Sequence, residues 1–263
     1  MAVVRTDHWL DKDFKDILAI CKRLKERFQG ADEKEIFHFL SKKGLYKPTF
    51  FSKIEYHKLK KLKVWDKIQH YYHIYKRKWD GPNIPIYIFP IHHSYNQNLQ
   101  KTGITFHDKI ILFLSPLEDE REYEAIFVHE YHHATRLNKI KKPLSDYTFL
   151  DSMVMEGLAE HAVEEYCGRD YLAKWCLYYS GKTIENFWDL FLLNNLNIKL
   201  DHPLHDVLLY GKRQFPNMVG YATGYYLIHQ YKQRNHFSTI TFLDAPSETF
   251  LLEKKRRNQD LDK

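Results

Sequence analysis

The stretch His129-Glu130-Tyr131-His132-His133 decides how this chain of 263 residues folds and which chemistry it can support. Its outer histidines are four residues apart, so on an α-helix they lie on one face, one turn from each other. Two imidazoles in that arrangement can bind one metal ion, and the intervening glutamate can take a proton from a water molecule on that ion. The stretch therefore predicts a helix with a zinc site, in which His129 and His133 are ligands and Glu130 is a general base.

The residues before this stretch predict that the helix is buried. Leu112-Phe113-Leu114 is typical of the end of a buried strand. Ser115 then offers an N-cap, Pro116 suits the first helical position, and Glu118 completes a capping box. The following turns are apolar on nearly all sides, so we expect a core helix over residues 116–137.

A second segment supports the metal site. We expect another helix over residues 148–167, with one face that is apolar except for Glu156 and Glu160. Burying a carboxylate costs free energy unless it is paired or binds a metal, and a zinc ion held by His129, His133 and Glu156 would remove that cost. Glu160, one turn further on, could hold the second ring nitrogen of a ligand histidine. The competing interpretation is a pair of core histidines and two glutamates on the surface.

The two motifs, H-E-x-x-H and then Glu156-Gly157-Leu158-Ala159-Glu160, resemble the gluzincin pattern of zinc metallopeptidases. The whole chain resembles the YjaZ-type bacterial family of predicted zinc-dependent proteases, most specifically over roughly residues 79–231. The resemblance implies a zincin-like fold, one zinc ion per chain and a peptide or protein substrate. It also implies the roles of five residues: His129, His133 and Glu156 as ligands, Glu130 as general base, and Glu160 in contact with a ligand, where many gluzincins have aspartate.

A last substantial helix is expected over residues 218–232. Its glycines Gly220 and Gly224 are four residues apart, so another element can approach closely on that side. In gluzincins a tyrosine or histidine from a later helix commonly faces the zinc and stabilises the oxyanion. The resemblance makes Tyr221 the first candidate for this role, Tyr225 the second and His229 the third. The alternative is that these rings only pack against the metal-binding helix.

The part of the chain before the motifs predicts helices and then a small sheet. Helical periodicity covers residues 8–29, 32–43 and 50–79, with the last region kinked or split. We therefore divide the chain at Asp80-Gly81-Pro82 into an N-terminal helical region, residues 1–80, and a zincin-like catalytic domain, residues 81–263. The expected fold class is α+β, mainly α.

The sheet is expected near residues 84–114. Residues 84–90 read as a strand that begins at an edge because of Pro85, and residues 103–106 and 109–114 read as a hairpin. One of these strands could bind a peptide by strand addition, or the sheet could serve only to support the metal-binding helix. His92-His93 allows a second metal site, but adjacent residues on an extended chain point to opposite sides.

Composition limits the classes of function. The net charge of +6 is dispersed, so nucleic-acid binding is not expected, although the lysine-rich run at residues 58–63 could contact nucleic acid or anionic lipid. The three cysteines show no disulfide or zinc spacing. The first residues lack the apolar run of a signal peptide, and no stretch reaches the roughly 20 apolar residues of a membrane span. We therefore expect a cytoplasmic protein; its oligomeric state is not predicted.

The expected function is hydrolysis of peptide bonds by a zinc metallopeptidase. Three alternatives remain open at this point: a zinc hydrolase of a non-peptide amide, a catalytically idle scaffold or regulator stabilised by zinc, and a nucleic-acid-binding helical protein. Beyond the last helix, residues 239–243 are expected to be extended and the basic tail at residues 254–257 is expected to be disordered.

Overall fold

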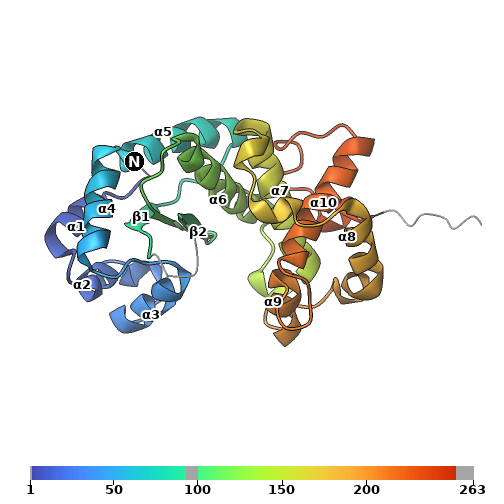
Figure 1. The fold of residues 1–263 in the computed structure, drawn as a ribbon, viewed down its shortest axis with the longest axis horizontal. Coiled ribbons are helices and arrows are strands. Elements are labelled where there is room, and N and C mark those ends of the chain that lie inside the picture. The colour runs from blue at the N-terminus through green and yellow to red at the C-terminus, as the bar shows by residue number, and fades with distance from the viewer. Residues whose placement is uncertain (1, 93–99, 253–263) are drawn as a thin grey trace, which may run out of the picture. The chain divides into compact units, whose positions relative to one another are not determined.

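The computed structural model describes residues 2–92 and 100–252 (Figure 1). These residues are mainly helical and contain one three-stranded sheet, which confirms the expected mainly α composition. The chain divides into two compact units. Unit 1 contains residues 1–141 and 162–172, and unit 2 contains residues 142–161 and 173–263. The zincin-like fold and the division at residue 80 stay predictions, and the expected disordered tail and His93 lie outside the described residues.

The sheet of unit 1 consists of β1 (Ile86–Pro90), β2 (Lys101–Thr105) and β3 (Ile110–Leu114). Its order is β1-β3-β2, so β3 is central, parallel to β1 and antiparallel to β2. All residues of β1 and β3 are buried, whereas those of β2 are half-buried. The predicted strand and hairpin are therefore confirmed, and β1 begins directly after Pro85, where the missing amide donor does no harm.

The outer edge of β1 is already hydrogen-bonded to other parts of unit 1. The amide of Val4 donates to the Ile86 carbonyl at 2.9 Å, and the amide of Tyr46 donates to the Pro90 carbonyl at 3.1 Å. Between these two bonds, the hydroxyl of Thr6 donates to the carbonyl of Ile88. Since edge strands expose unpaired backbone groups, this covering leaves β2 as the more accessible edge.

The N-terminal helices differ from the single helix expected over residues 8–29. The structure has two helices there and a short 3₁₀ turn, because the side chain of Asp16 accepts a hydrogen bond from the amide of Ala19 and caps a new helix. The region over 50–79 is split at Lys63, whose φ of 54° is left-handed. The helices of this region are α1 (Thr6–Asp13), α2 (Ile17–Lys22), η1 (Lys25–Arg27), α3 (Glu33–Lys43), α4 (Phe50–Lys61) and α5 (Val64–Trp79).

Helix α6 (Arg121–Ile140) carries the histidine motif, but it begins five residues later than expected. Ser115 is not an N-cap and no capping box forms, because its hydroxyl donates to the carbonyl of Gln100 at 2.8 Å. The hydroxyl of Tyr123 fixes the segment before the helix by donating to the Ser115 carbonyl and accepting from the Leu117 amide. The prediction therefore placed the helix correctly but mistook an ordered loop for its first turn.

Helices α5 and α6 lie side by side within unit 1 (Figure 1). Aromatic side chains pack between them. The ring of Tyr131 stacks on Trp79 at 6.0 Å and on Phe127 at 5.2 Å, measured between ring centroids. Phe127 and Tyr131 are one turn apart, and by helical geometry their face is opposite the one that carries His129 and His133. The rings thereby fix the rotation of α6 about its axis. The face that carries His129 and His133 takes no part in this aromatic contact.

In unit 2, helix α7 (Phe149–Tyr166) packs on α10 (Val219–Arg234) through glycine, and it continues past His161 into unit 1. A Cβ atom on Gly157 would overlap the carbonyl of Gly224, and one on Gly224 would overlap the carbonyl of Met153. Both predicted helical segments are therefore confirmed. Gly224 allows α7 to approach α10 closely, as was expected from the spacing of the glycines. The core around them is formed by apolar side chains that include Leu158, Trp188, Leu192, Leu208 and Leu227.

The rest of unit 2 is less regular than the sequence suggested. Residues 174–177 form a 3₁₀ turn, and the segment 239–243 is a series of turns instead of the expected extended segment. The amide of Thr241 donates to the Ser238 carbonyl, which closes one of these turns. No helix in the described residues combines the length and the apolar character of a membrane span. The remaining elements are η2 (Leu144–Asp146), η3 (Arg169–Tyr171), η4 (Lys174–Leu177), α8 (Gly181–Phe187), η5 (Trp188–Leu192), η6 (Leu193–Asn195), α9 (Pro203–Tyr210) and η7 (Ser247–Phe250).

Candidate metal centre

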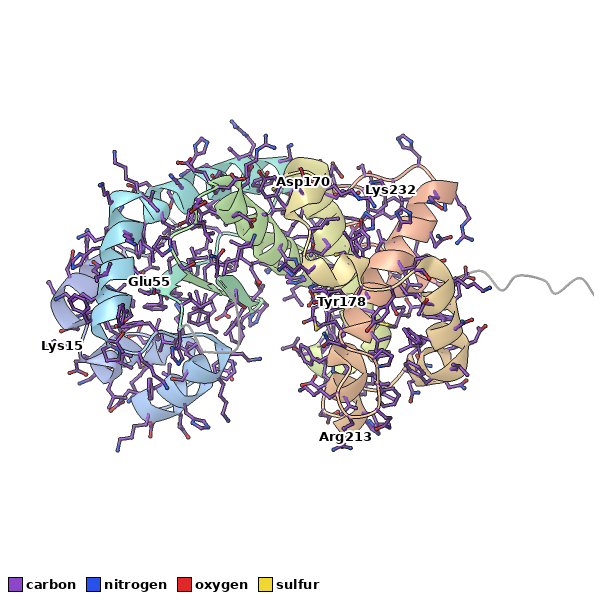
Figure 2. All side chains as sticks on the ribbon, in the orientation of Figure 1. Lys15, Glu55, Asp170, Tyr178, Arg213 and Lys232 are labelled. Atoms are coloured by element: carbon purple, nitrogen blue, oxygen red, sulfur yellow. The ribbon has the colours of Figure 1, made fainter. Side chains whose placement is uncertain are left out.

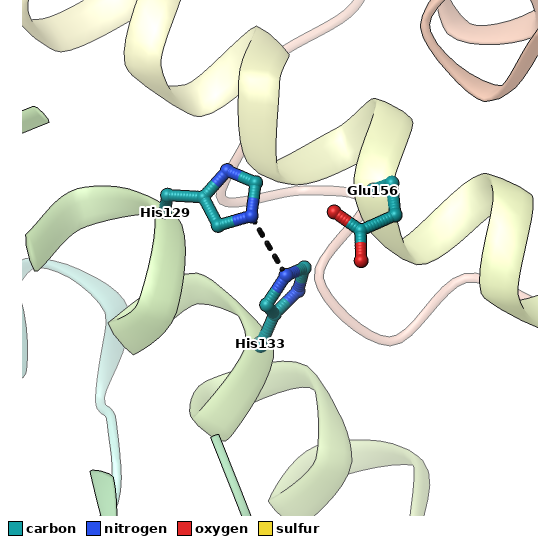
Figure 3. A group of neighbouring side chains, drawn as sticks. All are labelled: His129, His133 and Glu156. Atoms are coloured by element: carbon teal, nitrogen blue, oxygen red, sulfur yellow. Dashed lines mark hydrogen bonds between the residues drawn. The ribbon is translucent and has the colours of Figure 1, made fainter. Parts of the chain in front are cut away.

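Helix α6 brings the two motif histidines together as predicted. Their Nε2 atoms are 2.9 Å apart, and their rings meet edge to face with centroids 4.5 Å apart (Figure 3). Two nitrogens at about 2.1 Å from one tetrahedral zinc ion would lie about 3.4 Å apart. A small change in the two side-chain torsions would therefore suit both rings to a shared ion.

Glu130 points to the sheet within unit 1 and is held there by strand β2. Its side chain is buried, with the residue 6% exposed. The hydroxyl of Thr105 lies 2.6 Å from a carboxylate oxygen of Glu130, to which it donates, and 3.0 Å from the Glu130 carbonyl. A Cβ atom on Gly103 would overlap the Glu130 carboxyl group, so any other residue there would displace that side chain from its present position. Strand β2 therefore fixes the position of the predicted general base.

In unit 2, Glu156 on α7 lies among tyrosine hydroxyls. Burial raises the pKa of Tyr221 well above its ordinary value of 10, and the charge of Glu156 and the hydrogen bonds with Tyr210 and Glu156 raise it further. Burial also raises the pKa of Tyr210. The Tyr221 ring is held between Tyr210, at 5.5 Å, and Trp175, at 5.1 Å. Tyr221 therefore keeps its proton and can donate a hydrogen bond at neutral pH.

The three predicted ligands form a group with the spacing of a metal site. One ligand atom each of His129, His133 and Glu156 lies within 4.8 Å of the other two (Figure 3). Two histidines and a glutamate are a donor set that zinc uses in catalytic sites, where the fourth position is left to water or substrate. No other such group of three occurs in residues 2–92 and 100–252. This group can hold a metal ion, and its donors fit zinc.

Glu160 is buried on α7 and contacts Ala173 and Cys176, which also belong to unit 2. Its Oε2 atom accepts a hydrogen bond from the Ala173 amide at 2.7 Å and lies 3.5 Å from the Cys176 sulfur. The backbone that follows η3 is therefore attached to this carboxylate. The expected contact between Glu160 and a ligand histidine stays a prediction.

The second and third candidates for the oxyanion role lie against His161. The ring of Tyr225 stacks on the imidazole of His161 with centroids 4.4 Å apart, and His229 stacks on the same imidazole at 6.3 Å. The Tyr225 carbonyl is 3.2 Å from Nε2 of His161. Tyr221, by contrast, has Glu156 as its neighbour. The order of the three candidates stays a prediction.

Comparison with known proteins agrees with this arrangement. Residues 64–252 match a family model described as "Predicted Zn-dependent protease (DUF2268)". The chain belongs to this family. It is also 34% identical to "Uncharacterized protein YjaZ" of Bacillus subtilis (strain 168) over 259 residues, which are 95% of this chain and 98% of that protein. No solved structure matches the chain. The predicted resemblance to the YjaZ-type family is confirmed.

Three residues that contact Glu130 or Tyr221 were not found from the sequence. Thr105 and Gly103 contact Glu130, and Tyr210 contacts Tyr221. Gly103 was visible as a glycine inside a strand, which often marks the close approach of another group. Thr105 and Tyr210 carry no comparable signal, because a threonine in a strand and a tyrosine in a helix are ordinary core residues.

Proposed function

We propose that this protein is a zinc-dependent metallopeptidase with a zincin-like catalytic domain over residues 81–263. His129, His133 and Glu156 would hold one zinc ion per chain, and Glu130 would be the general base. The observation that carries the proposal is the convergence of three ligand atoms within 4.8 Å of one another, directly beside Glu130 in the sequence. The family description supports the same assignment.

The chemistry follows from the residues around the motif. A bound zinc ion supplies Lewis acidity and lowers the pKa of a water molecule towards about 7. The carboxylate of Glu130 would accept the proton of the attacking water and pass it to the leaving amine. Thr105 donates a hydrogen bond to one oxygen of the Glu130 carboxylate. This bond fixes the orientation of the carboxylate and therefore the position of its second oxygen. Glu130 therefore needs little reorganisation before it accepts the proton.

Tyr221 is the candidate for stabilising the oxyanion. A phenol that keeps its proton can donate a hydrogen bond to negative charge that develops on a carbonyl oxygen. Its hydroxyl interacts with Glu156, one of the proposed ligands, and its ring is packed on both sides. The hydrogen bond to Glu156 and the packing of the ring support this role over one for Tyr225, whose ring stacks on His161.

Strand β2 is the candidate for binding an extended peptide. Strand addition needs an edge with accessible backbone groups, and the outer edge of β1 is hydrogen-bonded at Ile86, Ile88 and Pro90. Strand β2 is the other edge, and its residues Gly103 and Thr105 contact the proposed base. A peptide paired with β2 would therefore lie beside Glu130.

The first test is metal content. Mass spectrometry of the untagged protein should find about one zinc per chain, and the double variant His129→Ala, His133→Ala should lose it. If the wild-type protein stays free of metal after zinc is supplied, the hydrolase proposal is wrong. His129 and His133 would then be ordinary core residues.

The second test separates zinc binding from peptide hydrolysis. Glu130→Gln should retain zinc and lose cleavage of a peptide library by about 10³-fold or more, because an amide cannot accept the proton. The matched control is Glu124→Gln, on the same helix in a half-buried position. Activity of Glu130→Gln close to that of the control would remove Glu130 from the mechanism.

A further inference from the structure

Helix α4 exposes two aromatic side chains at its start. Phe50 is 76% exposed and Phe51 is 77% exposed, and Ile54, one turn further on, is also exposed. The helix start is well defined, because Thr49 and Ser52 form a reciprocal capping box. Since a fixed group of exposed apolar side chains has a cost in water, it marks a surface that contacts something else.

The segment that contains this helix is strongly basic. Residues 42–63 contain eight lysines and one acidic residue, Glu55, which is labelled on α4 in Figure 2. The buried side of α4 carries Ser52, Tyr56 and Leu59. By helical geometry its opposite face carries His57 and five further exposed residues, and we call these five the α4 surface: Phe50, Phe51, Ile54, Lys58 and Lys61.

We propose that the α4 surface binds anionic lipid bilayers. Helices that lie on membranes combine an apolar group, which enters the headgroup region, with lysines that contact anionic lipids. Phenylalanine and isoleucine have no polar end, so they gain most when they are inserted among acyl chains. Each lysine near an anionic surface strengthens binding about fivefold. The α4 surface supplies both contributions from neighbouring turns of one helix.

The composition of the α4 surface favours a membrane over a nucleic acid. Residues 42–63 contain no arginine, although arginine is the residue that binds phosphates and bases in a bidentate way. The rings of Phe50 and Phe51 meet edge to face at 5.9 Å, so they pack as a pair instead of presenting two parallel stacking faces. Ile54 cannot stack on a base at all. The occupant we commit to is therefore an anionic bilayer.

The test is flotation of the full chain with vesicles. Wild-type protein should float with vesicles of equal parts phosphatidylcholine and phosphatidylglycerol and remain unbound with phosphatidylcholine alone. The variant Phe50→Ser, Phe51→Ser should lower the partition coefficient about tenfold. Lys58→Gln, Lys61→Gln should lower it about 25-fold, and added salt should weaken wild-type binding.

Controls of the same chemistry come from other exposed positions. Leu190→Ser removes an apolar side chain that is 74% exposed in unit 2, and Lys15→Gln, Lys182→Gln removes two exposed lysines, of which Lys15 is labelled in Figure 2. Both controls should bind vesicles like the wild type, and circular dichroism should show that every variant is folded. The proposal is overturned if wild-type protein does not bind anionic vesicles, or if the α4 variants bind as well as the controls. Salt-sensitive binding to single-stranded RNA without vesicle binding would assign the surface to nucleic acid instead.

Discussion

At the scale of single residues, Thr105 is the side chain through which the sheet controls the proposed base. Its hydroxyl donates to the carboxylate of Glu130 and contacts the carbonyl of the same residue. We expect Thr105→Val to lower kcat about tenfold with little change in KM, because the base loses its orientation but substrate contacts remain. Thr105→Ser should restore the rate, since it keeps the hydroxyl.

The control for Thr105 lies on the same strand. Thr102→Val makes the same chemical change at a half-buried position of β2 and should leave kcat unchanged. Steady-state kinetics on a cleaved library peptide, with zinc content measured for each variant, make the comparison. If Thr105→Ser is as slow as Thr105→Val, the hydroxyl has no positioning role.

Tyr221 can be tested by removing one oxygen atom. Tyr221→Phe keeps the ring contacts with Trp175 and Tyr210, so folding should be preserved. We expect kcat to fall about 10²-fold with zinc retained, the loss typical of one oxyanion donor. Tyr225→Phe is the matched control and should stay within about twofold of the wild-type rate. The reverse order of effects would make Tyr225 the donor.

At the scale of helices and strands, the contact between α7 and α10 depends on glycine. We expect Gly157→Ala and Gly224→Ala each to reduce the free energy of unfolding by about 3 kcal/mol, because the new methyl group overlaps backbone atoms that cannot rotate away. Gly30→Ala is the control: no atom lies within 4 Å of its Cβ position, and its φ of 86° should cost only about 1 kcal/mol. Urea unfolding followed by circular dichroism measures all three values. Equal losses would show that the contact is looser than the structure indicates.

Prediction from sequence succeeded for elements whose signals are local. The helices around His129 and Glu156 follow from apolar periodicity, and the convergence of their side chains was expected from the cost of a buried carboxylate. The start of α6 was placed wrongly because Ser115 is bonded to Gln100, 15 residues earlier. The contact between Thr105 and Glu130 spans 25 residues. Periodicity and capping rules contain no information on such contacts, which tertiary packing alone creates.

At the scale of the whole molecule, zinc should stabilise the fold by mass action. At about 100 times its dissociation constant, zinc should add about 2.7 kcal/mol, which raises Tm by roughly 5 to 10 °C. Differential scanning calorimetry with and without zinc measures this. The variant His129→Ala, His133→Ala should show no rise, and neither should wild-type protein with calcium, which prefers oxygen ligands. An equal rise in the histidine variant would place the stabilising ion elsewhere.

The hydrogen bonds that cover β1 also have a consequence for biosynthesis. Thr6 and Ile88 are 82 residues apart, so a ribosome that adds about 5–20 residues per second needs roughly 4 to 16 seconds to reach the second after the first. Throughout that interval the segment that will cover the strand is already synthesised. As β1 emerges, its outer edge can therefore be paired at once within its own chain. Neighbouring nascent chains on the same messenger then have little opportunity to pair with that strand.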